Sequence, residues 1–348
     1  MNARSRENIL VIGPSWVGDM VMAQSLFMLL RRQNPGCTIT VLAPDWTRAL
    51  LDRMPEVSAA IPARLDHGEL ALGKRRRIGR DLRRENFTQA IVLPNSFKSA
   101  LIPFHAGIPR RIGWRGEWRQ ALLNDCRTLD KDSFPRMLDR FAALAFDASD
   151  RPPAAVPYPA LVTDAGATAN ALGKLSLHLD YPILSLCPGA EFGESKQWPP
   201  EHFAELANEF LRKGWQIWLF GSANDRIAAE SVMADVENEF LDRVEDLTGR
   251  TMLGEAIDLL ALSAAVVSND SGLMHIAAAL GKPLVALYGS TSTAFTPPLA
   301  ERVKSLHTDI ECRPCFKREC PLGHKRCLKE LSPHRVASAV VELAADPE

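Results

Sequence analysis

The stretch Ile9-Leu-Val-Ile-Gly-Pro-Ser-Trp-Val-Gly-Asp-Met20 decides the fold, because it joins an apolar run to a helical pattern through a glycine turn. Residues 8–12 are rich in branched apolar side chains, as in a parallel strand that is buried on both faces. Residues 20–30 then repeat apolar side chains at helical spacing. We therefore predict an α/β fold that begins with a strand, a glycine loop and a helix.

The glycine loop carries one acidic residue, Asp19. Gly13 and Gly18 let backbone N–H groups approach a ligand. Their spacing, Gly-x4-Gly-Asp, departs from the Gly-x-Gly-x-x-Gly of dinucleotide sites, which argues against a nicotinamide-dependent oxidoreductase. A carboxylate here would also repel a phosphate, so we predict that Asp19 meets a hydroxyl group. The alternative, that Asp19 only caps the helix and favours its dipole, stays open.

Size and composition indicate a soluble protein of two domains. The chain has 348 residues, of which 46% are hydrophobic and 24% charged. No apolar run approaches the ~20 residues of a membrane span. The N-terminus lacks the apolar core and cleavage site of a signal peptide, so we expect a cytoplasmic protein with no transmembrane segment.

Seven strand-like segments alternate with helical patterns, at residues 9–12, 38–42, 90–93, 183–186, 216–220, 265–268 and 284–287. This alternation is interrupted between residues 93 and 183. We therefore predict two doubly wound, Rossmann-like domains that face each other across a cleft, with ligands at the carboxyl ends of the strands. We expect the domains at residues 1–165 and 166–348. The expected linker lies near residues 147–180, where Pro152, Pro153, Pro157 and Pro159 cluster.

Charge is divided unevenly between the two halves. Residues 1–150 hold 23 Lys and Arg against 16 Asp and Glu, and the remaining residues hold 18 against 26. The basic residues of positions 74–84 have helical spacing, so a solvated helix face explains them as well as a binding site does. Arg110, Arg111, Arg115 and Arg119 are expected in a loop. Such a field attracts an anionic partner; no nucleic-acid motif is present, and an acidic lipid headgroup fits.

The second half contains four strand-to-helix loops with small or polar residues. The loop after residue 186 holds Gly189 and Lys196, which suit a diphosphate. Later loops carry Ser222, Gly249 and Thr251, and then Asp270, Ser271 and Gly272 ahead of His275. Taken alone, Asp270 is better explained as a helix cap, and His275 as a helix histidine whose hydrogen bonds are satisfied. Together on one rim, the four loops predict a nucleotide-sugar pocket.

Several blocks of the sequence resemble the lipopolysaccharide heptosyltransferases over almost the whole chain. They include Gly13-Pro-Ser-Trp-Val-Gly-Asp19, Leu93-Pro-Asn-Ser-Phe-Lys-Ser-Ala100, Gly113-Trp-Arg-Gly-Glu117, Pro188-Gly-Ala-Glu-Phe-Gly193 and Asn269-Asp-Ser-Gly-Leu-Met-His275. The resemblance implies a GT-B architecture and an inverting transfer of heptose from ADP-L-glycero-D-manno-heptose onto the first heptose of the lipopolysaccharide inner core, heptosyl-Kdo2-lipid A. It also implies that the protein acts on a lipid A-core acceptor at the cytoplasmic face of the inner membrane.

The resemblance assigns roles to individual residues. Asp19 corresponds to the general base, Lys196 to the phosphate-binding lysine and Asp270 to the acid that holds the donor sugar. Donor binding is implied for Gly189, Ser222, Gly249, Thr251, Asp270, Ser271, Gly272, Leu273 and His275, and acceptor binding for Asn95, Ser96, Lys98, Arg111 and Arg115, joined by Arg119. This chain has Ala223 where a relative has a glutamate, which moves the expected ribose contact to Ser222 or Asp225.

The chemistry expected from these parts needs no obligatory metal or cofactor. Asp19 accepts the proton of the attacking hydroxyl. Lys196, the N–H groups at Ser271 and Gly272, and the helix dipole stabilise the departing ADP. Two alternatives remain: a relative that adds a different core heptose, and a non-catalytic nucleotide-binding protein.

Four of the seven cysteines, Cys312, Cys315, Cys320 and Cys327, lie within sixteen residues. Cys-x2-Cys is a common half of a structural zinc site, but the spacings of four and six that follow are irregular. A structural zinc ion, free thiols and a disulfide all stay open. Because the group follows the last expected strand, we expect it away from the proposed chemistry.

Overall fold

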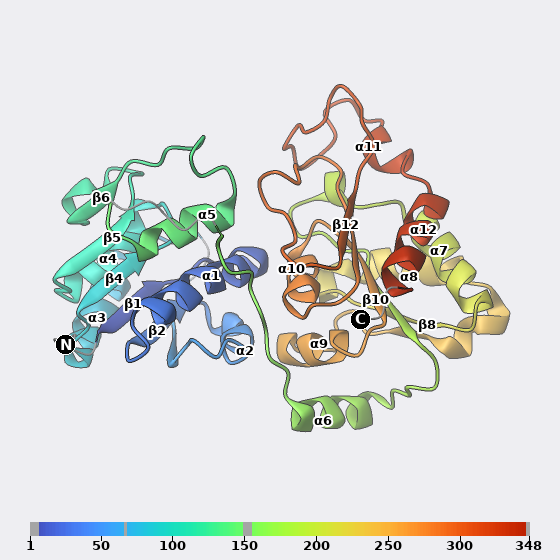
Figure 1. Ribbon diagram of the computed structural model, residues 1–348, viewed down its shortest axis with the longest axis horizontal. Helices are drawn as coiled ribbons and strands as arrows, with labels where there is room; N and C mark the ends of the chain where they lie inside the picture. The colour runs from blue at the N-terminus through green and yellow to red at the C-terminus, as the bar shows by residue number, and fades with distance from the viewer. Residues whose placement is uncertain (1–6, 66–67, 149–154, 346–348) are drawn as a thin grey trace. The chain divides into compact units, whose positions relative to one another are not determined.

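The computed structural model describes residues 7–65, 68–148 and 155–345. Residues 1–6, which include most of the N-terminus considered above, and Pro152 and Pro153 of the expected linker lie outside these ranges. The chain divides into two compact units, Met1–Pro159 and Ala160–Glu348. Each unit is built around one six-stranded sheet whose strands are all parallel (Figure 1).

The two sheets have the same strand order. The first runs β3-β2-β1-β4-β5-β6 and comprises β1 (Asn8–Ile12), β2 (Thr38–Ala43), β3 (Ala59–Pro62), β4 (Gln89–Val92), β5 (Arg110–Trp114) and β6 (Asp125–Arg127). The second runs β12-β11-β10-β7-β8-β9 and comprises β7 (Ile183–Cys187), β8 (Gln216–Leu219), β9 (Val244–Asp246), β10 (Ala265–Asn269), β11 (Leu284–Leu287) and β12 (Val303–Leu306). Two doubly wound, Rossmann-like sheets were predicted, and both are present.

Helices cover both faces of each sheet. Those of the first unit are α1 (Val17–Gln33), α2 (Arg48–Leu51), α3 (Leu72–Asp81), α4 (Phe97–His105) and α5 (Met137–Ala142). Those of the second are α6 (Ala165–Leu175), α7 (Pro200–Arg212), α8 (Arg226–Ala234), α9 (Leu253–Leu260), α10 (Gly272–Ala279), α11 (Arg326–Lys329) and α12 (Pro333–Ala344). Short 3-10 turns complete the description at η1 (Asp45–Thr47), η2 (Leu82–Glu85), η3 (Arg119–Ala121), η4 (Ala143–Ala145), η5 (Glu194–Lys196), η6 (Ala223–Asp225) and η7 (Asn238–Arg243).

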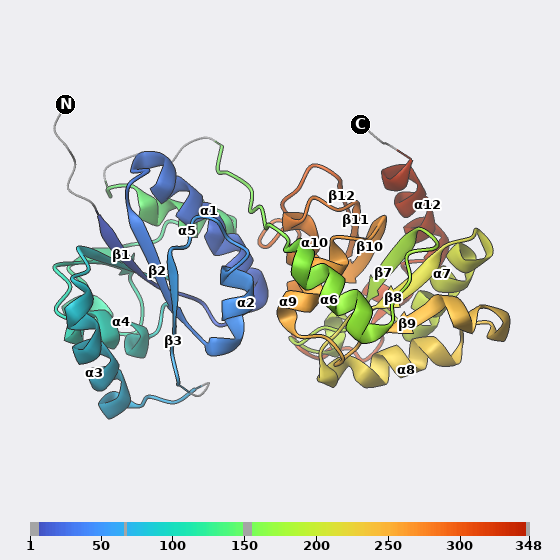
Figure 2. The same ribbon diagram turned by 90° about the horizontal axis from the view of Figure 1, so that it is seen from below.

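Alternating side chains of the central strands explain why two helical layers form. In the first unit, Leu10 and Ile12 of β1 pack with Leu101 and Ile102 of α4. The intervening residue Val11 is also fully buried, and because side chains alternate along a strand it lies on the opposite face of the sheet. In the second unit α7, α8 and α12 share one face, and α6, α9 and α10 lie on the other (Figure 2). Strands buried on both faces read as continuous apolar runs, which is why the central strands are visible in the sequence.

The strand order places a topological switch point in each sheet. Connections run outward from β1 through β2 to β3 and then return to β4 on its other side, and the second sheet repeats this between β7 and β10. Ligands of doubly wound folds bind outside the carboxyl ends of the strands at such points. The loops after β1, β4, β7 and β10 are therefore where the fold favours a site.

One local expectation is wrong. The first helix begins at Val17, so Gly18 and Asp19 lie in its first turn and not in the loop before it. Within the stretch expected as a linker, residues 165–175 form α6, whose Lys174 pairs with Glu255 of α9 at 2.8 Å. The first compact unit ends at Pro159, whereas the first domain was expected to end at residue 165.

Candidate functional site

A buried ion pair lies at the switch point of the second sheet. Lys196, at the end of η5 in the loop after β7, places its Nζ 2.6 Å from Oδ2 of Asp270, the residue that follows β10. The side chains are only 13% and 4% exposed. The same carboxylate oxygen accepts a hydrogen bond of 2.5 Å from the Thr291 hydroxyl. The two predicted donor residues Lys196 and Asp270 are thus brought together, and the loop after β11 supplies a partner, Thr291, that sequence reasoning missed.

The loop after β7 is held to β10 by the amide of Asn269. Its Nδ2 donates to the Pro188 carbonyl at 2.7 Å, and its Oδ1 accepts from the Trp198 backbone N–H at 3.1 Å. Asn269 is fully buried. Both ends of the Lys196 loop are therefore fixed to the strand that precedes Asp270.

His275, in the first turn of α10, is a neutral imidazole. Its side chain is 5% exposed. Burial lowers the pKa of His275 to about 4, because the nearby Asp270 carboxylate only partly offsets the loss of solvent. At neutral pH His275 offers hydrogen bonds and no positive charge. Ser271, Gly272 and Leu273 precede it at the start of α10, where backbone N–H groups have no partner within the helix.

The loops after β8 and β9 meet beside Gly189. Asp225 Oδ2 accepts bonds of 2.8 Å from both the backbone N–H and the hydroxyl of Ser222. A Cβ atom at Gly189 would lie 2.1 Å from Asp225 Cγ, so a glycine is needed for this approach. Gly249 has φ +68°, which favours glycine, and its N–H donates to the Gly221 carbonyl at 3.0 Å. Thr251 lies just before α9 and is half-buried.

The switch point of the first sheet holds Asp19 and three of the predicted acceptor residues. Asp19 lies in the first turn of α1, after β1, and is half-buried. Asn95 and Ser96 follow the neighbouring strand β4, and Lys98 is in the first turn of α4. Asp19 and Lys98 therefore belong to loop-to-helix junctions of adjacent strands, β1 and β4, which pair in register from Ile9 with Gln89 to Ile12 with Val92.

The predicted arginine loop is corrected by the structure. Arg110 and Arg111 belong to β5, and the Arg111 guanidinium donates to the carbonyls of Ile108 and Leu122. Arg119 is completely buried and binds Trp114, Pro94, Ser99 and Asn95, so it holds the loop after β4 and cannot meet an acceptor. Arg115 is exposed.

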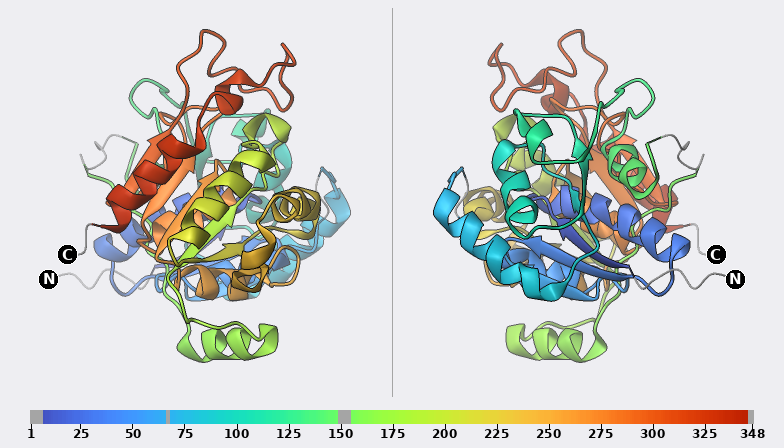
Figure 3. Two further views of the ribbon diagram at one scale, coloured as in Figure 1. Left: turned by 90° about the vertical axis from the view of Figure 1, so that its right-hand side faces the viewer. Right: turned by 90° about the vertical axis from the view of Figure 1, so that its left-hand side faces the viewer.

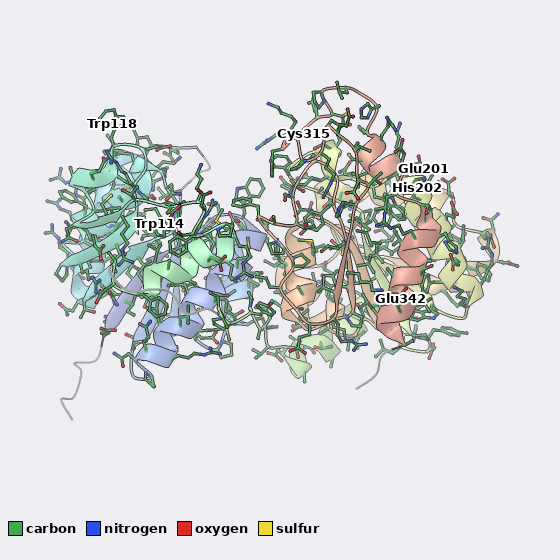
Figure 4. The ribbon with its side chains drawn as sticks, turned by 45° about the horizontal axis from the view of Figure 1, so that its top comes forward. Trp114, Trp118, Glu201, His202, Cys315 and Glu342 are labelled. Atoms are coloured by element: carbon green, nitrogen blue, oxygen red, sulfur yellow. The ribbon has the colours of Figure 1, made fainter. Side chains whose placement is uncertain are left out.

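The basic helix α3 combines one structural arginine with an exposed surface. Arg75 is buried and donates to the carbonyls of Glu69, Leu70 and Lys98. The exposed basic residues of α3 and η2 are Lys74, Arg76, Arg77, Arg80, Arg83 and Arg84. Trp118, in the loop after β5, is 89% exposed and is marked with the buried Trp114 in Figure 4. Among the described residues, none of the helices combines the length and apolar content that crossing a bilayer requires.

The cysteine segment, residues 310–327, lies against the Lys196 loop, so the expectation that it is remote from that loop is wrong. The Ser195 backbone N–H donates to the Arg318 carbonyl at 3.2 Å, and the Ser195 hydroxyl donates to the Lys317 carbonyl. Arg313 donates to the carbonyls of Gly289 and Thr291 at 2.9 and 3.1 Å. This return could not be predicted from the sequence, because the segment follows β12, an edge strand without a recognisable strand pattern.

Comparison with known proteins identifies close relatives. A family model described as glycosyltransferase family 9 (heptosyltransferase) matches residues 75–326. Lipopolysaccharide heptosyltransferase 2 of Salmonella typhimurium is 46% identical over 343 residues, 97% of this chain and 99% of the relative. The protein of the same name from Escherichia coli is 46% identical over 98% of this chain and 99% of its own length. The structure of E. coli ADP-heptose LPS heptosyltransferase II superposes with a TM-score of 0.89 and 44% identity, over 97% of this chain and 98% of that one.

Proposed function

The chain belongs to glycosyltransferase family 9, the heptosyltransferases, and from this membership we propose that it moves heptose from ADP-heptose to the lipopolysaccharide inner core. It is a glycosyltransferase of the GT-B type. The proposed donor is ADP-L-glycero-D-manno-heptose and the proposed acceptor is heptosyl-Kdo2-lipid A. The observation that carries this assignment is the 46% identity to lipopolysaccharide heptosyltransferase 2 over nearly the full length of both chains.

On the donor side, we assign the diphosphate to Lys196 and the start of α10. Lys196 supplies a positive charge, and the N–H groups at Ser271, Gly272 and Leu273 point from a helix N-terminus, where anions are favoured. Because Lys196 already pairs with Asp270 at 2.6 Å, an arriving diphosphate competes for the ammonium group. Asp270 then keeps its bond from Thr291 and has capacity for a hydroxyl of the donor sugar.

The nucleoside is assigned to the loops after β8 and β9. Ser222 is exposed and its hydroxyl is oriented by Asp225, so this pair can bind ribose hydroxyls. Gly189, Gly249 and Thr251 would line the same region.

On the acceptor side, we assign the general base to Asp19. A sugar hydroxyl has too high a pKa to ionise unaided, so a carboxylate that accepts its proton during attack on the anomeric carbon contributes about 10²–10⁴-fold. The C–O bond to the diphosphate breaks as the new glycosidic bond forms, which inverts the anomeric centre. Lys98, Arg115, Asn95 and Ser96 are proposed to hold the phosphorylated acceptor. Arg111 ranks behind them, since its guanidinium already binds two carbonyls.

We propose that catalysis needs no obligatory metal, because Lys196 and the α10 N-terminus can stabilise the developing charge on ADP. Turnover is then expected without any metal ion added to the assay. We also propose that the protein works peripherally at the cytoplasmic face of the inner membrane. The exposed basic side chains of α3 and η2 support this, since anionic headgroups attract such clusters.

The deciding experiment incubates the purified protein with ADP-heptose and a panel of defined truncated core acceptors, and identifies products by mass spectrometry and NMR. We expect transfer to the acceptor that ends in a single heptose, with inversion at the anomeric carbon. Transfer only to a different acceptor would assign the chain to another core heptose. Binding of ADP-heptose without turnover on any acceptor would favour a non-catalytic nucleotide-binding protein.

A further inference from the structure

The four clustered cysteines of the cysteine segment share one cavity. Cys312, Cys315, Cys320 and Cys327 all line a hollow of about 390 Å³, counting the space at its open mouth. The segment lies at the end of the second unit that is remote from α6, as Figures 1 and 3 show, and Cys315 is marked in Figure 4. The other three cysteines of the chain, Cys37, Cys126 and Cys187, do not line this cavity.

The backbone turns tightly after Cys320, and the Gly323 N–H donates to the Cys320 carbonyl at 3.0 Å. Backbone N–H groups of this turn, that of Lys325 above all, lower the pKa of Cys320. Gly323 at φ +69° and Lys325 at φ +49° give the chain the tight turn that directs these groups inward. A turn of N–H groups around a cysteine sulfur is suited to a sulfur that carries negative charge.

Four thiols at such close quarters need a positive charge between them if they are to ionise. Burial, and then the proximity of Cys312, Cys320 and Cys315, raise the pKa of Cys327. Burial lowers the pKa of Arg313. The nearby Cys327 raises the pKa of Arg313 by a smaller amount. Arg313 and Lys325 line the same hollow, and Arg326 interacts with Cys312, but none of these cations bonds the sulfurs. A divalent cation bonded to all four sulfurs can hold them as thiolates.

We propose that Cys312, Cys315, Cys320 and Cys327 bind one divalent, thiolate-preferring metal ion, zinc or ferrous iron, in a four-sulfur site. Binding displaces the thiol protons to solvent and forms four metal–sulfur bonds. Among the described residues no three His, Cys, Asp or Glu side chains are placed so that they could hold a metal ion, so binding requires the cysteine side chains to move. Rotation of the cysteine side chains about their Cα–Cβ bonds, into the cavity that they line, brings the sulfurs together around the ion.

The position of the site gives it a consequence for the proposed donor pocket. The segment carries Lys317 and Arg318, which bind Ser195 beside Lys196, and Arg313, which binds Gly289 and Thr291. Lys196 and Thr291 both bind the carboxylate of Asp270. A metal ion that fixes the segment therefore braces both partners of that carboxylate. This second step rests on the proposed donor role of Lys196 and Asp270, whereas the metal site does not.

The test is metal analysis of the full-length protein, made and purified under reducing conditions. We expect about one equivalent of zinc or iron per chain. The variants Cys315→Ser and Cys320→Ser should lose it, and the matched control Cys126→Ser, whose cysteine lies in β6, should keep it. Should a serine variant fail to fold, cobalt added to metal-stripped parent protein serves instead, and a sulfur-to-cobalt charge-transfer band is expected.

Metal below about a tenth of an equivalent, together with no such band, would overturn the proposal. A disulfide between any two of these cysteines in the reduced preparation would overturn it as well. The brace is tested separately by calorimetry with ADP, where metal removal should weaken binding severalfold and metal return should restore it. If metal removal leaves the ADP affinity unchanged, the metal does not stabilise the donor pocket, although the metal site itself is still supported. A protein that is inactive with ADP-heptose would contradict the proposed function, and the metal analysis would be unaffected.

Discussion

At the scale of single residues, Asp19 tests the catalytic proposal most directly. It lies in the first turn of α1, where a negative charge also favours the helix dipole. Asp19→Asn keeps the shape and removes the base. We expect turnover to fall by about 10²–10⁴-fold while ADP affinity stays within a factor of two of the parent, because the residue serves the acceptor and not the nucleotide.

The matched control for Asp19 is Glu201→Gln. Glu201 is an exposed acidic residue in the first turn of α7, so its replacement loses the same dipole interaction, about 0.3–1 kcal/mol, without touching the candidate site. Initial rates and the free energy of unfolding are measured for both variants. An Asp19→Asn enzyme within tenfold of parental turnover would show that the residue is only a helix-stabilising acid.

The contribution of the Lys196–Asp270 pair to stability can be separated from its contribution to activity. Lys196→Ala leaves a carboxylate that is 4% exposed without its cation, which costs about 3–5 kcal/mol in unfolding free energy for a buried pair. It should also lower donor affinity and turnover together. In the double variant Lys196→Ala/Asp270→Asn the stability should return and the activity should not. Calorimetry with ADP that finds unchanged affinity for Lys196→Ala would place the diphosphate elsewhere.

His275 predicts a pH dependence of stability. Burial lowers its pKa from the ordinary 6.5 to about 4, so the unfolded chain binds a proton that the folded chain rejects. The resulting stability is full above about pH 6.5 and is lost as the pH falls towards 4, by roughly 3 kcal/mol in all. Urea titrations across this range should show the slope in the parent and in His334→Gln, an exposed control. If the unfolding free energy of His275→Gln depends on pH as that of the parent does, groups other than His275 cause the dependence.

At the scale of elements, the central strands could be predicted and the outer ones could not. β1, β4, β7 and β10 are buried on both faces and appear as apolar runs. β5 begins with two arginines, and β9 is Val-Glu-Asp, so neither carries such a run. Likewise Arg119 looks like a surface cation in the sequence, and only the loop that folds over it makes it a buried anchor. Thr291 and the return of the cysteine segment depend on contacts far apart in the chain, which no local pattern encodes.

Gly189 links the loop after β7 to the 3-10 turn η6. In Gly189→Ala the new methyl group would lie 2.1 Å from Asp225 Cγ, so Asp225 must move and release Ser222. We expect a loss of about 1–3 kcal/mol of unfolding free energy, together with weaker ADP binding. The control is Gly173→Ala in α6, where a Cβ meets nothing within 4 Å. That change should add about 0.5–1 kcal/mol and leave ADP affinity alone, and equal ADP affinities in both variants would contradict the role of η6.

At the scale of the whole molecule, the two units share one strand order but belong to halves of the chain with opposite net charge. The half that carries Asp19 has 23 basic residues against 16 acidic ones, and the half that carries Lys196 has 18 against 26. A basic domain suits a phosphorylated, membrane-borne acceptor. The sequence predicted this division, but it left open whether the basic helix is a binding surface or a solvated face. In the structure Arg75 is buried and donates to the carbonyl of Lys98, whereas its basic neighbours are exposed. Substitution of the exposed residues can therefore distinguish a binding surface from a solvated helix face.

The exposed residues Arg76 and Arg77 of α3 therefore test the proposal that the protein binds a membrane surface. Each basic side chain near an anionic surface contributes about 1 kcal/mol, so Arg76→Glu/Arg77→Glu should weaken binding to anionic vesicles by roughly thirtyfold or more. The effect should shrink as salt shortens the Debye length, about 8 Å at 0.15 M. The matched control reverses two exposed charges of the second unit, Arg226→Glu/Lys329→Glu. Cosedimentation with phosphatidylglycerol and phosphatidylcholine vesicles makes the measurement, and equal losses in both double variants would reduce α3 to a solvated helix face.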